Sequence, residues 1–405
     1  MRPTPLLLPL LGLLLACGDA GSGDAATGDA STTAASTTDE PTTTGEVDLN
    51  ERELGASASP ACVAAKTHAA TLAAAAATGD AAAASAAYTG TPLQTYVQQL
   101  DGLATRSDDA DISAWLTDGD APALAAAAAR LQVAYAVHLR ASLAAVETGA
   151  EDKYAAWDEA HCLWQAALRP LAVEADAVGW HSFSETIAAD IDAALADGHD
   201  AISGEPPSTT IDDWRVPPNK QRAEKSLFRA AQRVIVELAG AAKAGPDPVA
   251  ARRALELFGL VEDRLDGRNT PGIQQIKDIL AGDPAMIDPN TVLAELDIAF
   301  AKRTRNYADQ AITGDEVGVP AGYKGAIEGS TYALLLVPGM ISTLGAEFIP
   351  EAYVGEWGGY AELVRSGDDG MGTLGKVSQR LIDQTCAYQT ALGIAACTGD
   401  ADESK

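Results

Sequence analysis

The sequence predicts an all-α fold in which repeated αα-hairpins pack as a helical bundle. After the first 50 residues the chain is rich in Ala and Leu, and aromatic residues make up only 5% of the total. Apolar residues recur three and four positions apart, and no strand-length alternation competes with that period. Gly residues end the periodic segments, as they do at helix C-caps.

Two apolar stripes define the predicted helices best. The first is Leu131, Tyr135, Leu139, Leu143 and Val146, and the second is Tyr154, Trp157, His161, Trp164 and Leu168. The same spacing continues in Phe228, Ile235 and Leu238 and in Leu255, Phe258 and Leu265. Each stripe is expected to face the core of the bundle.

Four breaks divide the helical part into hairpins: Thr78-Gly79-Asp80, Thr148-Gly149, Gly245-Pro246-Asp247 and Thr313-Gly314-Asp315. The second helices of the last three hairpins share a carboxylate in one register: Ala156-Trp157-Asp158, Ala254-Leu255-Glu256 and Ala326-Ile327-Glu328. This match predicts a repeated hairpin unit, with chance agreement of a short motif as the alternative.

The N-terminus predicts an exported lipoprotein. Residues 6–17 read LLLPLLGLLLAC, too short to span a bilayer, and end in small residues at Cys17. We expect a signal peptide over 1–17, lipidation of Cys17, a flexible linker over 18–50, a helical domain over 51–398 and a frayed tail over 399–405. The protein would then lie in the cell envelope, periplasmic or at the cell surface. The alternative is an ordinary secretory signal, in which case Cys17 is lost.

Charge limits the partners. The chain has 28 basic and 57 acidic residues, a formal net charge of -29. Such a surface repels nucleic acid and anionic lipid, so we expect no nucleic-acid partner and membrane contact through the lipid anchor alone. It favours cations.

Cys17 aside, four cysteines remain: Cys62, Cys162, Cys386 and Cys397. An even number in an oxidising compartment indicates two disulfides, for which three connectivities exist. The closeness of Cys386 and Cys397 in the sequence favours that pair, which leaves Cys62 with Cys162. No CxxC pair is present, which disfavours a thiolate zinc or redox site.

The strongest candidate site lies in Lys153–Trp164. Asp158 and His161 are three residues apart and share a helix face, the spacing with which bundle proteins hold iron or manganese. Glu159 follows Asp158, and His138 lies on the preceding stripe. The alternative is that the histidines are core residues and the acids are helix-dipole partners.

Glu256 and Glu328 join the candidate ligands through their shared register with Asp158. An inward carboxylate in a bundle needs a cation, which a metal or a neighbouring Lys or Arg can supply. His181 and Glu185 also have ligand-like spacing, but Ser182-x-x-Glu185 is a capping box for a helix over 186–196. His68 and His199 are expected to be exposed or incidental. The absence of GxSxG, P-loop, GxGxxG and HExxH motifs disfavours hydrolase and nucleotide-dependent functions, and we expect no enzyme.

Around Trp157-Asp158-Glu159-Ala160 the chain resembles the algal iron-assimilating proteins, the low-iron- or high-CO2-inducible periplasmic proteins with bacterial relatives. Ala326-Ile327-Glu328-Gly329 with Tyr332 is similar to a second copy of their motif. The resemblance implies iron capture or delivery outside the cytoplasm. Imelysin-like proteins are a weaker resemblance, because Gly179-x-His181 is followed by Glu185, one residue too far for their GxHxxE motif.

Two functional hypotheses follow. The first is a lipid-anchored, non-enzymatic iron-binding protein in which Asp158, Glu159, His161, Glu256 and Glu328 converge between helices. The second is a structural or protein-binding lipoprotein, with an envelope protein as its partner and the acids as solubilising charge. A ferroxidase-like enzyme ranks third, because only one acid-x-x-His step is present.

Overall fold

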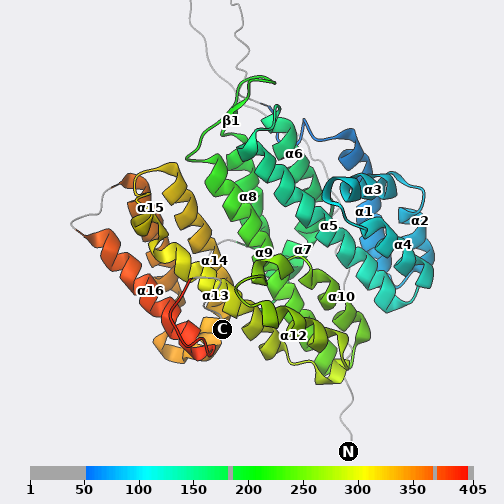
Figure 1. Cartoon of the computed structure of the whole chain (residues 1–405). Coiled ribbons are helices and arrows are strands. Elements are labelled where there is room, and N and C mark those ends of the chain that lie inside the picture. Colours follow the sequence, from blue (N-terminus) through cyan, green and yellow to red (C-terminus); the bar gives the residue numbers. More distant parts are fainter. Residues whose placement is uncertain (1–51, 181–185, 368–371, 400–405) are drawn as a thin grey trace, which may run out of the picture. The chain divides into compact units, whose positions relative to one another are not determined.

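The computed structural model describes residues 52–180, 186–367 and 372–399. The predictions for residues 1–50, Cys17 included, and for His181, Ser182 and Glu185 lie outside these described residues. Within them the chain forms the expected all-α bundle (Figure 1). One two-residue antiparallel ladder, β1 (Ile202–Ser203) with β2 (Thr210–Ile211), was not expected.

The helices, in chain order, are α1 (Pro60–Thr78), α2 (Ala81–Tyr88), α3 (Pro92–Ala104), α4 (Asp108–Asp118), α5 (Ala121–Thr148), α6 (Lys153–Leu163), the π-helical turn η1 (Trp164–Leu168), α7 (Arg169–Ala177), α8 (Ile187–His199), α9 (Val216–Ala244), α10 (Pro248–Phe258), α11 (Glu262–Leu265), α12 (Thr270–Ala281), the 3₁₀ turn η2 (Pro284–Met286), α13 (Pro289–Thr313), α14 (Pro320–Leu344), the 3₁₀ turn η3 (Gly345–Glu347), α15 (Pro350–Ser366) and α16 (Thr373–Ala391).

Hairpins form where the sequence predicts them. The pairs α1/α2, α5/α6, α9/α10 and α13/α14 each pack together across one of the four breaks. Gly149 ends α5 at a φ of +116°, which L side chains rarely adopt. Asp152 and Asp247 then cap the N-termini of α6 and α10 by accepting from backbone N–H groups. Asp158, Glu256 and Glu328 therefore lie on the second helices of three hairpins.

Helix α9 is the central element of the body. It is 29 residues long and packs against α8, α10, α13 and α14, and also against α5 and α7 (Figure 1). Because neighbours surround it, both its apolar and its polar side chains are buried. Lys220, Glu224, Lys225, Arg229 and Arg233 are all less than 10% exposed. Charged groups taken out of water in this way need compensating partners.

The predicted stripes form the core. Leu131, Tyr135 and Leu143 are buried, and so are Trp157 and Trp164. Small residues let the helices approach closely, most clearly at Gly198, where a Cβ atom would lie 2.1 Å from the Trp157 indole. Full burial of each large apolar side chain contributes about 1.5–3 kcal/mol, so these aromatic residues fix the packing of α6 on α8.

One helical stretch, 320–347, is long and apolar enough to cross a membrane by length and composition. It contains α14, a core helix of the bundle, and half of the tested window is buried inside the body. Packing against α9, α13 and α15 accounts for its apolar character.

Candidate functional site

Asp158, on α6, binds the backbone of the segment that precedes α1. Its Oδ1 accepts a hydrogen bond from Gly55 N and its Oδ2 accepts one from Ser57 N, each at 2.8 Å. The side chain is fully buried. Two N–H donors compensate a buried carboxylate for its lost water. The chain itself thus occupies the oxygens that a metal ion would need.

Glu159 binds the same segment at Ser59, two residues after Ser57. Its Oε2 accepts from Ser59 N at 2.8 Å, and its Oε1 accepts from the Ser59 hydroxyl at 3.0 Å and from the Tyr96 hydroxyl. Ser59 is in turn the N-cap of α1 and accepts from Cys62 N. Burial and the bond to Glu159 raise the pKa of Tyr96, which keeps this phenol a donor.

We call Asp158 and Glu159, together with the backbone N–H groups of Gly55, Ser57 and Ser59, the N-terminal clamp. Cys62 and Cys162 form a disulfide close to it, with Cα atoms 6.3 Å apart, and so link α1 to the end of α6. Cys386 and Cys397 form the second, with Cα atoms 5.1 Å apart. The favoured connectivity is confirmed, and Cys397 lies beyond the end of α16.

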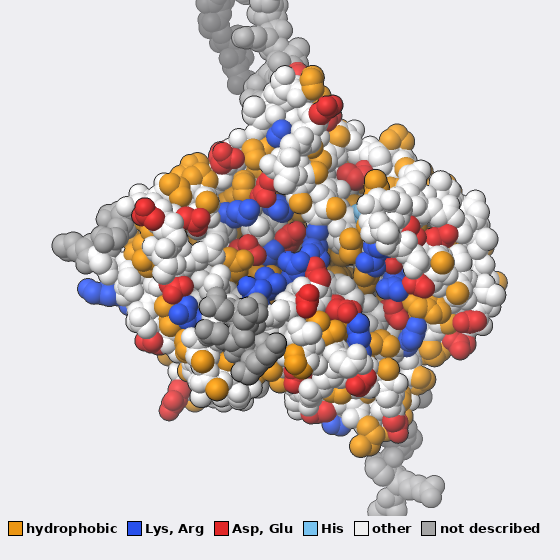
Figure 2. All heavy atoms as spheres, in the orientation of Figure 1, with side chains coloured by type: hydrophobic (Ala, Val, Ile, Leu, Met, Phe, Trp, Pro, Cys, Tyr) orange, Lys and Arg blue, Asp and Glu red, His pale blue; other side chains and the backbone are white. Residues whose placement is uncertain are grey.

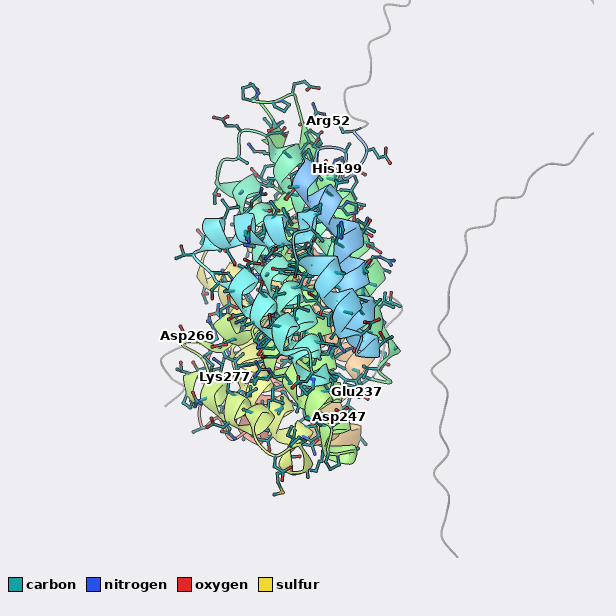
Figure 3. All side chains as sticks on the ribbon, turned by 90° about the vertical axis from the view of Figure 1, so that its right-hand side faces the viewer. Arg52, His199, Glu237, Asp247, Asp266 and Lys277 are labelled. Carbon is teal, nitrogen blue, oxygen red and sulfur yellow. A yellow bond between two sulfur atoms is a disulfide. The ribbon has the colours of Figure 1, made fainter. Side chains whose placement is uncertain are left out.

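An aromatic contact extends the clamp toward residue 52. The Arg52 guanidinium lies 4.8 Å from the Tyr154 ring centroid and pairs with Glu205. His199 meets the same ring edge-on at 5.2 Å, and its Nε2 lies 3.4 Å from Asp158 Oδ1. Figure 3 shows Arg52 and His199 near one end of the body, far from Asp247 and Asp266.

The expectation that His199 is exposed or incidental was wrong, because its side chain is only 3% exposed. Ile191, Leu195 and His199 follow one another at four-residue steps, and this spacing indicates that His199 lies on the buried face of α8.

His161 is half-buried beside Gly55, where a Cβ atom would lie 3.0 Å from its Nδ1. Burial lowers the pKa of His161, while Asp158 opposes the shift. Asp158, His161 and His199 therefore gather under the segment that begins at residue 52.

Glu256 has partners of its own. On α10, its Oε1 lies 3.0 Å from Arg252 Nη2, and its Oε2 lies 3.9 Å from Arg130 Nη1. Arg130 also pairs with Asp108 and Asp111. Burial raises the pKa of Glu256, and the two guanidiniums offset part of that rise.

Glu328 is paired with a buried lysine. Its Oε1 lies 3.2 Å from Nζ of Lys225, which is also 2.7 Å from Glu224 Oε2. Burial alone would lower the pKa of Lys225, but Tyr332, Glu328 and Glu224 together raise it. The inward carboxylate of Glu328 thus has the cation that the sequence analysis expects, and α9 supplies it. The sequence analysis did not predict that α9 carries buried charged side chains.

His138 is buried on α5, and its Nε2 has no hydrogen-bond partner among the described residues. Burial lowers its pKa, and the Arg106 guanidinium lowers it further. The ring is a core histidine near a different set of charges from those around Asp158.

The structure gives Asp158, Glu256 and Glu328 three separate sets of partners instead of bringing them into one group. Over residues 52–180, 186–367 and 372–399, no three or more His, Cys, Asp or Glu side chains are arranged to hold a metal ion. Equal register within a hairpin put the carboxylates on equivalent helices, but their partners differ in kind. Asp158 accepts from backbone N–H groups, Glu256 pairs with arginines of α10 and α5, and Glu328 pairs with a lysine of α9. Metal binding by these residues stays a prediction.

Comparison with known proteins adds no evidence about the function of the chain. The chain matches no protein-family model, no curated protein and no solved structure. The likeness to iron-assimilating proteins therefore rests on the short motifs alone.

Proposed function

We propose that this protein is a lipid-anchored, non-enzymatic binding protein of the cell envelope, periplasmic or at the cell surface. In this proposal Cys17 carries the lipid and residues 18–50 are the spacer. The observation that supports it is the N-terminal clamp. The first described segment after the proposed spacer is tied to α6 by three backbone hydrogen bonds and, within a few residues, by a disulfide.

The clamp suits a tethered body for a mechanical reason. Force on a lipid anchor reaches the domain through the residues that precede α1. Without the clamp that force would act on the first turn of α1, where helix ends fray most easily. With it, the load passes to α6, whose Trp157 and Leu163 are fully buried.

A binding role rather than catalysis is favoured by how the buried carboxylates are used. Asp158, Glu159 and Glu328 all serve partners from the chain itself. A general acid or base needs access to substrate, and both oxygens of Asp158 and of Glu159 accept hydrogen bonds from the chain itself.

The test is lipidation in a bacterial host. The intact chain is expected to incorporate labelled palmitate and to sediment with membranes, while Cys17→Ser is expected to lose both properties. A Ser substitution of Thr27 in the proposed spacer is the matched control and should behave like the parent. An unlabelled parent, or a Cys17→Ser variant that still sediments, would contradict the proposal.

Iron binding is the second candidate. It rests on the Asp158-x-x-His161 spacing on α6, since a carboxylate and an imidazole are common iron ligands. Gly55 and Ser57 cover these groups, so binding would require their segment to withdraw. Iron affinity is to be measured by titration for the parent, for Asp158→Ala with His161→Ala, and for Glu256→Ala as control. Equal affinity in all three would refute this candidate.

A further inference from the structure

A strongly acidic protein carries a concentration of basic side chains on one face. The chain has a net charge of -29, yet Lys and Arg side chains gather across the middle of the face shown in Figure 2, where Figure 1 labels α9 and α14. Named contacts place four cations over two aromatic rings, and a fifth, Arg268, interacts electrostatically with Tyr332, Arg264 and Arg303. We call this set the basic groove: Arg140, Lys225, Arg264, Arg268 and Arg303, with the rings of Phe228 and Tyr332.

The rings form the floor of the basic groove. Arg140, Lys225 and Arg264 lie 5.3, 5.5 and 5.7 Å from the Phe228 centroid. Lys225 and Arg303 lie 5.7 and 5.9 Å from the Tyr332 centroid. Cation–π attraction holds cationic groups over such faces without neutralising them.

Three of the cations have acidic partners. Lys225 pairs with Glu224 and Glu328. Arg140 and Arg264 share the carboxylate of Asp263, at 2.7 and 2.5 Å from its Oδ2. Three carboxylates therefore neutralise three cations, so none of these carboxylates is left to neutralise Arg268 or Arg303.

Arg268 and Arg303 are different. Within the part of the chain that the structure describes, neither has an ion pair with a carboxylate, and Arg268 Nε is buried without a hydrogen-bond partner. Arg303 Nε donates to the backbone carbonyl of Arg264 at 3.3 Å. Burial lowers the pKa of Arg268, and the Arg303 and Arg264 guanidiniums add to the effect. The positive charges of Arg268, Arg303 and Arg264 thus repel one another, at a cost that an anion would remove.

A hydroxyl completes the arrangement. The Tyr332 side chain is fully buried, and its hydroxyl has no hydrogen-bond partner among the described residues. Tyr307 stacks on the same ring at 6.1 Å with an interplanar angle of 11°. An unpaired buried hydroxyl is costly unless something else accepts from it or donates to it.

A cavity adjoins the basic groove at Arg140. This cavity has a volume of about 470 Å³ and is lined by Arg106, Arg140, Glu224 and Asp263 with four small or apolar residues of α5 and the α10–α11 turn. The Asp263 side chain at its mouth is 48% exposed. A small solute can therefore reach Arg106 and Arg140 from this cavity, and Arg268 and Arg303 are themselves partly exposed.

We propose that the basic groove binds a small oxyanion with two or more negative charges, a phosphate or a polycarboxylate. Arg268 and Arg303 supply the uncompensated charge, and guanidinium forks match both carboxylate and phosphate oxygens. The Tyr332 hydroxyl donates the further hydrogen bond. The inference is independent of lipidation and of iron.

The test is calorimetric titration of the purified full chain with inorganic phosphate and, separately, with citrate, against chloride at equal ionic strength. Saturable binding of one equivalent is expected for at least one probe, weakening as salt rises. The arm that binds assigns the oxyanion to the phosphate or the carboxylate class. No saturable binding of either probe would overturn the inference.

Variants test the residues. Arg268→Gln with Arg303→Gln is expected to lower the affinity at least about tenfold, the size of losing charge-assisted hydrogen bonds. Arg380→Gln, which removes an exposed arginine of α16, is the matched control and should bind like the parent. Equal losses in both would indicate general charge attraction and refute the site.

Two further variants separate binding from folding. Tyr332→Phe removes only the unpaired hydroxyl, so it should weaken anion binding severalfold without lowering the melting temperature. Arg268→Lys keeps the charge but loses the fork, and covers the case in which the double variant fails to fold. Unchanged affinity in both of these would contradict the proposed contacts.

Discussion

Replacing Asp158 with Asn isolates the main contact of the N-terminal clamp. The Asn side chain keeps one acceptor oxygen for either Gly55 N or Ser57 N, but its NH₂ group then faces the other N–H. One charge-assisted hydrogen bond is lost, and the second becomes a neutral one. Because hydrogen bonds to charged groups contribute about 1.5–3 kcal/mol each, we expect the free energy of unfolding to fall by about 3 kcal/mol.

The assay is urea unfolding followed by near-ultraviolet circular dichroism, with limited proteolysis at neutral pH. Asp158→Asn should lower the urea midpoint and admit cleavage within residues 52–59. Asp278→Asn, an exposed acid on α12, removes the same charge and is the control. If Asp158→Asn leaves both the midpoint and the cleavage pattern as in the control, the clamp contributes nothing and the reasoning fails.

Three other perturbations follow from the packing. Removal of the Cys62–Cys162 disulfide, which spans 100 residues, should lower the free energy of unfolding by about 4–5 kcal/mol. A double Ser variant with the same melting temperature as the parent would contradict this. Gly198→Ala puts a Cβ atom 2.1 Å from the Trp157 ring, and a loss of about 1–3 kcal/mol is expected from overpacking; full stability by urea titration would show that the indole moves freely. Burial raises the pKa of Asp297, on α13, to about 8. Between pH 5 and 7 the native state therefore keeps the Asp297 proton, whereas the unfolded state has lost it. The free energy of unfolding should therefore fall as pH rises from 5 to 7. Asp297→Asn should reduce that slope by about 1.4 kcal/mol per pH unit, and identical slopes in the two proteins would refute the shift.

The hairpin boundaries could be predicted because their signals are local. Gly149, Asp152 and Asp247 act within one turn of a helix end, and the residue order carries that information. The core stripes were equally accessible, because a helical period puts Leu131 and Tyr135 on one face whatever packs against it.

The use of each carboxylate could not be read from the sequence. Asp158 meets Gly55, 103 residues away, and Glu328 meets Lys225 on another hairpin. The spacing of Asp158 and His161 fixes a shared helix face, but not whether metal, backbone or lysine lies opposite. The basic groove was hidden for the same reason, since its side chains come from α5, α9, α13, α14 and the α11 region.

Net charge does not describe the local distribution of charge at the basic groove. An excess of acids over the whole chain predicted a preference for cations, whereas Arg268 and Arg303 lie together without a carboxylate. Charge distribution in the folded chain, rather than its sum, decides what a cavity attracts.

Amide hydrogen exchange at Gly55, Ser57 and Ser59, measured with and without ferrous iron, tests most directly whether the α6 carboxylates serve the chain's own backbone. Slow exchange at all three amides, unchanged by the metal, is the predicted result. Fast exchange in the metal-free protein, or protection that disappears when iron is added, would contradict the account.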